Sequence, residues 1–440
     1  MGVMGGHFLD IIPERHEKFP WRLIPFIVIW VLFALVVLVL LHHFSTASVL
    51  TSPQVWLFVT LLIPQPRRPR PSEKTFKTVD RTGSVTDPEP LPCWYDRALE
   101  KYRRAQQEDK KIDIEKEIEP AELFMTVVVP AFNEENRLVG MLEEAVTYLE
   151  NEYGTSATAT ATAEKTLDDG ETTTRRRAVP KTTAATSANG DVASRSGRGW
   201  EILLIDDGST DDTILTAQTF SRVHILPRHA RRASGPWTHG DGAAVNIPPG
   251  SIRMVSLEEN RGKGGAVTHG MRHARGQYVV FADADGASKF EDLGKLVKAC
   301  QEIEDDEGRG VAVGSRAHLV DSEAVVKRSK LRNFLMHSFH LLLKFMTPPR
   351  TAQVKDTQCG FKLFSRSTLP YIVPHMHTEG WIFDVEMLML AEFSAIPVVE
   401  VAIGWHEVVG SKLNVIKDSI TMAWGLAVLR FCWGTGIYRR

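Results

Sequence analysis

From residue 121 onward, strand-like apolar runs alternate with stretches whose apolar residues recur at helical spacing. A strand that is followed by a helix and then by another strand builds a parallel sheet covered by helices. The pattern therefore predicts an α/β domain with a mostly parallel central sheet. The predicted order is strand 123–129, helix 136–151, strand 201–205, helix 211–221, strand 252–255, helix 264–274 and strand 278–282.

Two stretches interrupt this alternation. Residues 154–199 are dominated by Thr, Ala, Ser and Arg and contain too few large apolar residues to fold, so we expect a disordered insertion between a helix and a strand. Residues 228–250, which carry His, Gly and Pro, predict a second, smaller insertion.

The amino-terminal pattern differs from that of a water-soluble domain. Residues 23–41 form a 19-residue run without a charged side chain, about long enough to cross a bilayer as a helix. A cleaved signal peptide is disfavoured, because the run is long and lacks an obvious small-residue cleavage site. Residues 1–63 therefore predict a membrane anchor, with 49–63 as a second apolar segment that either returns through the membrane or lies at its interface.

The anchor is followed by a basic cluster and by less regular sequence. Basic residues that flank a span favour the cytosolic side, which predicts a cytosolic location for the rest of the chain. Residues 64–120 are expected to be a linker and a charged helix, and residues 121–412 the folded domain. The basic cluster consists of Arg67, Arg68, Arg70, Lys74 and Lys77.

Two further apolar segments lie within and after the folded domain. Residues 334–346 and 420–438 are too apolar for solvated helices and too short or too interrupted for a clear span. Both fit helices in a membrane interface, although packing as core helices is the alternative. We expect residues 413–440 to form a carboxy-terminal membrane-interface helix.

Composition narrows the possible functions. The formal net charge of −2 gives no reason to expect a nucleic-acid partner. The four cysteines are scattered without a Cys-x-x-Cys pair, which argues against a zinc site and a disulfide framework.

Carboxylates follow two of the predicted strands. Asp283 and Asp285 come after strand 278–282, and the Asp206–Asp207 pair ends strand 201–205. Because strand carboxyl ends meet at one edge of a parallel sheet, these acids should face one crevice. A divalent cation that carries nucleotide phosphates would balance their charge. Taken alone, either pair could instead be an acidic or capped turn.

A glycine-rich turn precedes the predicted helix 264–274. Glycines at a helix amino terminus let backbone N–H groups approach a phosphate, and Lys263 adds positive charge. The spacing matches neither a Walker loop nor a dinucleotide fingerprint, and a bare glycine turn is the alternative.

Together these residues resemble the inverting glycosyltransferases of family 2, which have the GT-A fold. Four more segments resemble the eukaryotic dolichyl-phosphate β-glucosyltransferases within that family, enzymes of the endoplasmic reticulum with an amino-terminal anchor. The resemblance covers about 121–154 and 200–415. The four segments are 311–319, 332–336, 356–364 and 381–386.

The resemblance implies a role for each matched position. It places Asp283 and Asp285 on Mg²⁺ or Mn²⁺ bound to the donor diphosphate. It leaves Asp384 as either a catalytic base or a residue that orders Lys362 or a loop. The positions that would bind the nucleotide-sugar are Pro130, Phe132, Glu134, Asp206, Asp207, Lys263, Asp283 and Ala284. Those that would face the acceptor phosphate, or else the donor diphosphate, are Arg316, Arg328 and Arg332, although Arg328 and Arg332 could simply be basic residues at a lipid surface. The catalytic set is Asp285, Arg316 and Asp384.

The implied reaction is transfer of glucose from UDP-glucose to dolichyl phosphate with inversion, at the endoplasmic reticulum membrane with the catalytic domain facing the cytosol. A dolichyl- or polyprenyl-phosphate mannosyltransferase, or another polyprenyl-phosphate glycosyltransferase, would use the same metal and arginines. A processive polysaccharide synthase is disfavoured, because Gln-x-x-Arg-Trp and multiple carboxy-terminal spans are absent from the sequence. A non-catalytic membrane protein that binds a nucleotide-sugar is a more distant alternative. The sequence does not determine the oligomeric state.

Overall fold

The structure is a computed structural model of the 440-residue chain. It describes residues 63, 65–154, 198–225, 245–319, 338–339, 341–408 and 415–439. The chain divides into two compact units, Met1–Ile63 and Pro64–Arg440. The predicted anchor helix at 23–41 and the segment 49–62 lie outside the described residues. Within the described ranges, the structure contains no helix that is both long and apolar enough to cross a membrane.

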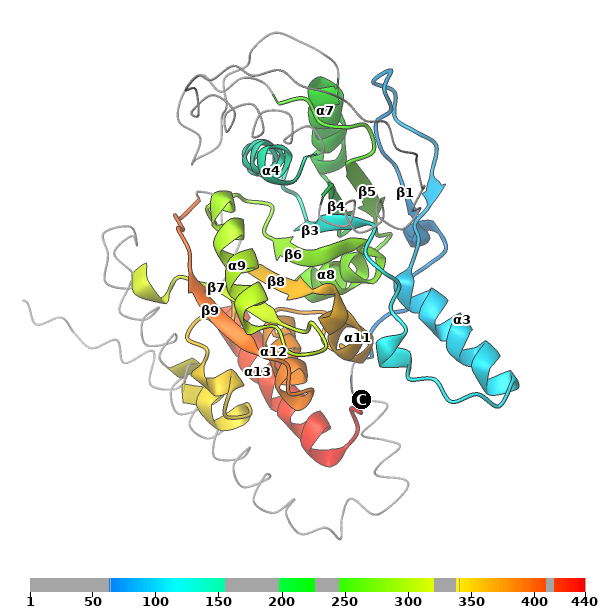
Figure 1. The fold of residues 1–440 in the computed structure, drawn as a ribbon. Helices are drawn as coiled ribbons and strands as arrows, with labels where there is room; N and C mark the ends of the chain where they lie inside the picture. Colours follow the sequence, from blue (N-terminus) through cyan, green and yellow to red (C-terminus); the bar gives the residue numbers. More distant parts are fainter. Residues whose placement is uncertain are drawn as a thin grey trace, which may run out of the picture. The chain divides into compact units, whose positions relative to one another are not determined.

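A seven-stranded sheet forms the centre of the second unit (Figure 1). Its order is β5-β4-β3-β6-β8-β7-β9, and every neighbouring pair is parallel except those made by β8, which runs against both β6 and β7. The mostly parallel sheet is thus confirmed. The strands are β3 (Leu123–Ala131), β4 (Trp200–Asp206), β5 (Ile252–Ser256), β6 (Gly276–Ala282), β7 (Val311–Ser315), β8 (Phe361–Ser365) and β9 (Val398–Ala402).

Helices cover both faces of this sheet, and the side chains of each strand alternate between the two. On β3, Val127 and Val129 belong to one apolar cluster and Val128 to the other. The first cluster includes residues of α4 (Leu138–Tyr153), α7 (Thr213–Ile225) and α9 (Leu293–Ile303). The second includes residues of α8 (Gly262–His273), α11 (Leu369–Ile372) and α12 (Phe383–Phe393).

The segment that we expected to be a linker is part of the folded unit. Lys77 forms an antiparallel bridge with Met254 of β5, and Thr78 Oγ1 donates to the carbonyl of Ile252 at 2.8 Å. Short strands β1 (Thr75–Phe76) and β2 (Glu89–Pro90) pair with each other. The charged helix is α3 (Trp94–Gln107), and Trp94 Nε1 donates to Met271 O at 2.8 Å. The Pro- and Arg-rich composition suggested a linker, whereas a few apolar side chains bury against the sheet edge.

Both predicted insertions begin and end at the amino edge of the sheet. Gly199, just before β4, donates its N–H to the carbonyl of Tyr153 at the end of α4, at 2.8 Å. Ile247 N, ahead of β5, donates to His224 O in α7 at 3.1 Å. Residues 155–197 and 226–244 themselves lie outside the described part of the chain.

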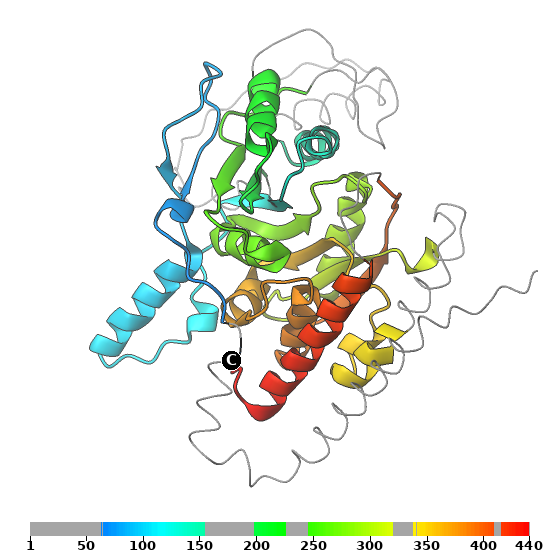
Figure 2. The same ribbon diagram turned by 180° about the vertical axis from the view of Figure 1, so that it is seen from behind.

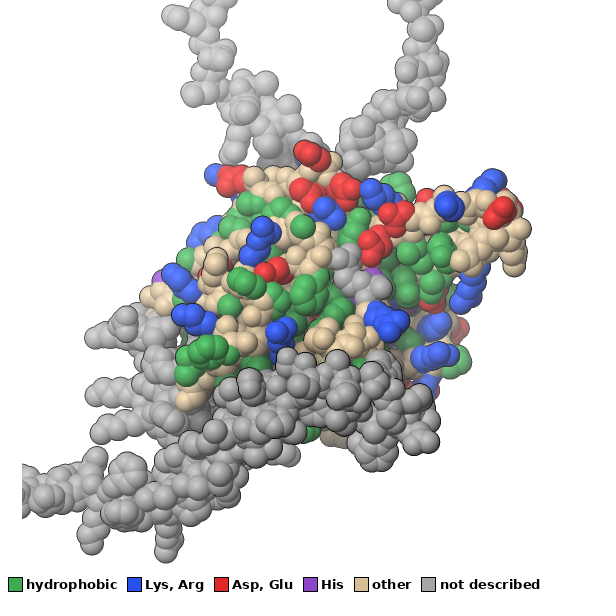
Figure 3. Space-filling model, turned by 90° about the horizontal axis from the view of Figure 1, so that it is seen from below, with side chains coloured by type: hydrophobic (Ala, Val, Ile, Leu, Met, Phe, Trp, Pro, Cys, Tyr) green, Lys and Arg blue, Asp and Glu red, His purple; other side chains and the backbone are tan. Residues whose placement is uncertain are grey.

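The carboxy-terminal helix α13 (Val415–Thr435) packs along α12, as Figure 2 shows. Leu426, Leu429 and Cys432 are buried, whereas Ile420 and Trp424 are 47% and 56% exposed. Residues 341–346 are also helical and two-faced, with Leu343 buried and Phe345 exposed. Viewed from below Figure 1, the described surface shows hydrophobic side chains among lysines and arginines (Figure 3). Each of these helices therefore packs with one face and exposes the other.

Candidate active site

Asp283 and Asp285 leave the carboxyl end of β6 at the centre of the sheet. Asp283 Oδ1 lies 2.6 Å from Lys263 Nζ, and its N–H donates to the carbonyl of Gly360 at 3.1 Å. A Cβ atom on Gly360 would lie 2.0 Å from an Asp283 carboxylate oxygen, so the turn before β8 needs glycine to pass this side chain.

Asp285 is held more loosely than Asp283. Its Oδ1 accepts from the N–H of Ala287 at 3.0 Å, and Arg137 Nη1 lies 3.8 Å from Oδ2. Burial and the neighbouring Asp283 carboxylate raise the pKa of Asp285. Two close carboxylates repel each other and gain from a cation between them.

The end of β4 contributes a second pair of acids to the same edge. Asp206 Oδ1 accepts from Ser209 N at 3.1 Å, which caps the turn, and burial raises its pKa. Asp207 Oδ1 accepts from the N–H of Arg261 at 2.6 Å. Burial raises the pKa of Asp207 to about 6, although the N–H groups of Arg261 and Gly262 oppose the shift.

Lys263 lies in the first turn of α8, directly beside the acids of β6. Burial alone would lower its pKa, but Asp283 and Asp384 outweigh that effect and raise it, so the ammonium stays charged. Its Nζ also lies 5.9 Å from the ring centroid of Trp381, a side chain that is 41% exposed. A cation and a helix amino terminus at an acidic edge suit a ligand that carries both phosphates and a metal.

Asp384 and Lys362 form a buried pair beneath the acidic edge. Lys362 Nζ donates to Asp384 Oδ1 at 2.5 Å and also to the carbonyl of Cys359. Burial raises the pKa of Asp384, while Lys362 opposes the shift. Lys362 has no exposed surface and Asp384 is 3% exposed, so this carboxylate is engaged inside the protein.

Arg316 follows β7 and is oriented by a carboxylate. Its Nε and Nη2 donate to the two oxygens of Asp356 at 2.7 and 2.9 Å, a bidentate arrangement, and its N–H donates to Asp356 as well. The guanidinium lies over the Trp405 ring, 5.5 Å from the centroid. Arg328 and Arg332 lie outside the described residues.

The first strand supplies the remaining expected positions. Pro130 is in β3 opposite Ile205, Phe132 follows the strand and is 41% exposed, and Ala284 is buried between the two acids of β6. Glu134 Oε1 accepts from Arg137 Nη2 at 2.6 Å. The structure thus brings Glu134, Arg137 and Asp285 into one chain of contacts.

Sequence reasoning missed several partners at this edge. It assigned nothing to Arg137, to Asp356 as the partner of Arg316, or to the rings of Trp381 and Trp405. The early signal was that Asp356 and Trp381 lie in segments that resemble the family. Apart from the pair of Arg137 with Glu134, these contacts join residues far apart in the chain.

The acids that follow β6 supply oxygen ligands of the kind that magnesium and manganese ions favour. Mg²⁺ commonly binds one or two carboxylates and completes its shell with water and phosphate oxygens. Among the described residues no group of three His, Cys, Asp or Glu gathers around one point. Asp283 and Asp285 offer carboxylate oxygens of the kind that such an ion binds.

Comparison with known proteins places the chain in a family. The glycosyl transferase family 2 profile matches residues 189–370. Together with the sheet order, this indicates a GT-A-like fold. A solved glucosyl-3-phosphoglycerate synthase from Mycobacterium tuberculosis, in complex with Mg²⁺ and UDP, is 15% identical and has a TM-score of 0.39. The match covers 70% of this chain and 79% of the synthase chain.

Curated relatives are considerably more similar. The dolichyl-phosphate β-glucosyltransferase of Saccharomyces cerevisiae is 35% identical over 402 residues, which is 90% of this chain and 94% of the yeast protein. The human dolichyl-phosphate β-glucosyltransferase is 33% identical over 72% of this chain and 77% of its own length. On this evidence the chain belongs to the dolichyl-phosphate β-glucosyltransferase family.

Proposed function

We propose that the chain transfers glucose from UDP-glucose to dolichyl phosphate with inversion, yielding dolichyl β-D-glucosyl phosphate for protein N-glycosylation. The observation that carries the proposal is the 35% identity with the yeast enzyme over 90% of this chain. The acidic edge with Lys263 supports it, because the combination suits a nucleoside diphosphate bound with a metal.

In this proposal the donor nucleotide lies along the edge formed by β3 and β4. Pro130, Phe132 and Glu134 would contact the uracil and ribose, and Asp207 would accept from the base or a ribose hydroxyl. Asp206 shapes the turn that holds Asp207, and Ala284 fills the space between the two acids of β6. Burial of both β4 acids supports the assignment. A carboxylate shielded from water discriminates strongly between ligands that donate a hydrogen bond to it and ligands that do not.

Asp283 and Asp285 would hold Mg²⁺ or Mn²⁺ on the donor diphosphate. When bound, the metal would neutralise the charge that develops on the departing UDP. Lys263 adds a second cation at the same edge, since its ammonium lies 2.6 Å from Asp283.

The phosphate of the acceptor has to be positioned for attack more than it has to be deprotonated. A phosphate monoester is already largely dianionic near neutral pH, because its second pKa is about 6. Arg316, Arg328 and Arg332 would orient that phosphate for attack on the anomeric carbon from the face opposite UDP. The buried contact between Asp384 and Lys362 supports a positioning role for Asp384 rather than proton removal from the acceptor.

A lipid acceptor is consistent with the exposed apolar side chains of α13 and residues 341–346. We infer that these faces contact the membrane interface and that the enzyme acts on the cytosolic side of the endoplasmic reticulum. The exposed side chains are Leu341, Phe345, Ile420 and Trp424. Fluorescence localisation and protease protection of the tagged chain in microsomes would test the placement, and a lumenal catalytic domain would contradict it.

The function is tested by expressing the full chain in membranes that lack endogenous activity and supplying dolichyl phosphate with radiolabelled UDP-glucose or GDP-mannose. We expect labelled glycolipid from UDP-glucose alone. Product from GDP-mannose alone would favour the mannosyltransferase alternative. Saturable UDP-glucose binding without any product would favour the non-catalytic alternative.

A further inference from the structure

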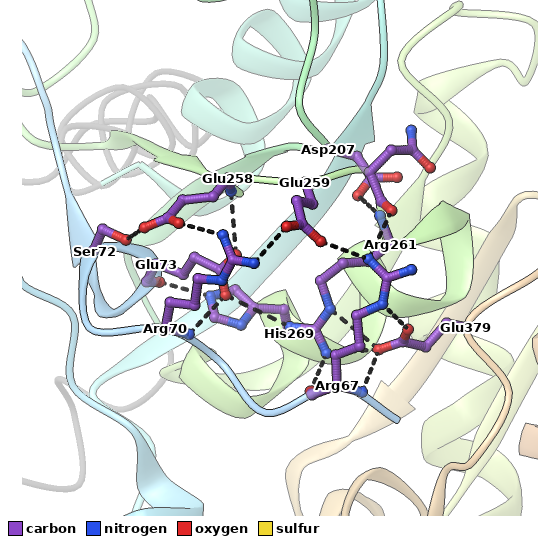
Figure 4. A network of polar contacts seen from close by, with 11 residues as sticks. Arg67, Arg70, Ser72, Glu73, Asp207, Glu258, Glu259, Arg261, His269 and Glu379 are labelled. Carbon is purple, nitrogen blue, oxygen red and sulfur yellow. Dashed lines mark hydrogen bonds and ion pairs between the residues drawn. The ribbon is translucent and has the colours of Figure 1, made fainter. Parts of the chain in front are cut away.

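A short amino-terminal segment lies against the loops that carry the donor-binding candidates. We call residues 65–73 the arm. Arg70 contacts Glu258 and Glu259, and Arg67 Nη1 donates to Glu259 at 3.2 Å and to Asn260 O at 3.3 Å. Figure 4 shows these contacts, and beside them those that join Arg67 to Arg261 and Glu379. The arm thus meets two loops, residues 258–261 ahead of α8 and residues 376–381 ahead of α12.

Arg261 contacts the end of β4 through its backbone and the loop 376–381 through its side chain. Its backbone N–H donates to Asp207 at 2.6 Å, the acid proposed above to accept from the nucleoside. Its guanidinium donates to Glu379 Oε1 from Nε at 3.1 Å and from Nη2 at 2.7 Å. The Arg261 side chain is 7% exposed and that of Glu379 18%, so solvent screens this pair far less than a surface pair.

Glu379 in turn holds the amino end of α8 through its backbone. Its carbonyl accepts from Gly265 N at 3.1 Å. A Cβ on Gly262, which has a φ of +80°, would lie 2.7 Å from that carbonyl oxygen. The loop therefore seats closely on the turn that presents Lys263 to Asp283, and Trp381 two residues later lies over Lys263.

Backbone groups of the arm contact both Arg261 and Glu379. Arg67 N donates to Glu379 Oε1 at 3.0 Å, and Arg67 O accepts from Arg261 Nη2. Glu73 carries the contact further, because its carbonyl lies 2.9 Å from His269 Nε2 in α8 and its carboxylate accepts from Glu258 N at 3.1 Å. A carboxylate and a guanidinium thereby connect three chain segments.

We propose that Arg261 and Glu379 are positioning residues for the donor nucleotide. The pair fixes Asp207 through the Arg261 backbone, and it fixes the amino terminus of α8 and Lys263 through the Glu379 backbone. Neither side chain has to touch the substrate. This inference rests on the proposed function, because it assumes that the edge at Asp207 and Lys263 binds the nucleotide.

The inference predicts a selective effect on the donor. Loss of the pair leaves the backbone contacts in place but releases the two loops relative to each other, so ordering them becomes a cost of binding. The acceptor candidate Arg316 makes its described contacts with Asp356 and Trp405, which are not part of this network. Donor affinity should therefore fall while acceptor affinity is retained.

The experiment uses the purified full-length chain in detergent and measures binding of UDP with Mg²⁺ by calorimetry, together with steady-state transfer to dolichyl phosphate. We expect Glu379→Ala to weaken UDP binding and raise KM for UDP-glucose by about tenfold, with kcat and KM for dolichyl phosphate within about twofold of wild type. Glu379→Gln, which keeps an acceptor oxygen, should give a UDP affinity between those of wild type and Glu379→Ala. Arg261→Lys should resemble Glu379→Ala, because lysine lacks the guanidinium fork.

The matched control is Glu307→Gln, which removes an exposed ion pair with Lys116 at 2.9 Å. This change should leave UDP binding at the wild-type value. If Glu379→Ala fails to fold, Glu379→Gln decides the question. Wild-type UDP affinity in a folded Glu379→Gln or Arg261→Lys variant, or a lower melting temperature without a change in UDP affinity, would overturn the inference. Absence of glucose transfer by the wild-type chain that still binds UDP would count against the proposed function and leave the binding comparison intact.

Discussion

The two ends of strand β4 bury carboxylates in opposite ways. At the amino end Glu201 has no exposed surface, and its oxygens accept from Thr126 Oγ1 at 2.8 Å and from Arg275 Nε and Nη2 at 2.9 and 2.7 Å. At the carboxyl end Asp206 and Asp207 are also buried, yet they accept mainly from backbone N–H groups, and burial raises the pKa of both.

The difference separates architecture from function within one strand. An acid whose oxygens already accept from a hydroxyl and a guanidinium is satisfied by the fold itself, whereas acids with a raised pKa retain electrostatic free energy that a ligand can relieve. Asp285, at the same carboxyl edge, behaves like Asp207 in this respect. Changes at the carboxyl edge should therefore affect catalysis, and changes at the amino edge should affect stability.

The largest expected effect follows from removing the acid at the end of β6. We expect Asp285→Ala to lower kcat/KM for glucose transfer by about 10³-fold, because a preorganised electrostatic contact in a catalytic site is worth that much. The melting temperature should stay at the wild-type value or rise slightly, since the repulsion with Asp283 disappears. Radiometric transfer and thermal unfolding of the same preparation measure both quantities. Undiminished transfer would remove this residue from the mechanism.

At the opposite edge the same kind of change should act on folding. Glu201→Ala leaves Arg275 without its buried partner, and breaking a buried pair from one side costs about 3–5 kcal/mol. Denaturant unfolding should show that loss in the free energy of unfolding. The KM for UDP-glucose of the remaining folded enzyme should match wild type. A raised KM would contradict the assignment of catalysis to the carboxyl edge and stability to the amino edge.

Substitution of Arg316 tests whether the carboxyl edge also binds the acceptor phosphate. Arg316→Lys keeps the charge but loses the bidentate contact with Asp356, so we expect kcat/KM for dolichyl phosphate to fall by roughly 10–100-fold. Kinetics at varied dolichyl phosphate concentration should show the loss in kcat/KM for this acceptor, while the affinity for UDP stays constant. Asp356→Asn should give a smaller loss of the same kind, and an effect confined to the donor would contradict the assignment.

The smallest expected effect is a dependence on pH. As pH falls through about 6, Asp207 takes up a proton and no longer accepts as a carboxylate, so KM for UDP-glucose should rise a few-fold. The effect of Asp207 on stability depends on pH in the opposite direction. Because its pKa is higher in the folded than in the unfolded state, protonation favours folding. The stabilisation from Asp207 therefore falls as pH rises from the ordinary carboxyl range to about 6. Asp207→Asn should remove its part of both trends in a pH series of KM and of unfolding.

Most of the fold was predictable because its signals are local. The alternation of strands and helices between residues 123 and 282 matches the structure, with bounds that shift by a few residues. The acids at the ends of β4 and β6 were predictable for the same reason, since each follows its own strand directly.

The remainder depends on contacts between distant segments. The antiparallel entry of β8 brings Gly360 against Asp283, and 40 positions separate Arg316 from Asp356. The arm was mistaken for a linker because its contacts involve charged side chains and backbone groups that a hydrophobic pattern does not register. Such partners require the tertiary structure.

The closed bases of the two insertions make the amino edge a permissive place for changes in chain length. A hydrogen bond already joins the flanks of each insertion, at Tyr153 and Gly199 and at His224 and Ile247. The entropy of closing a loop grows only logarithmically with its length, so lengthening or shortening the intervening sequence should alter stability little. Both points of attachment lie at the edge opposite the acids of β4 and β6. An epitope or a fluorescent domain could therefore replace residues 155–197 while the chemistry at the other edge proceeds undisturbed.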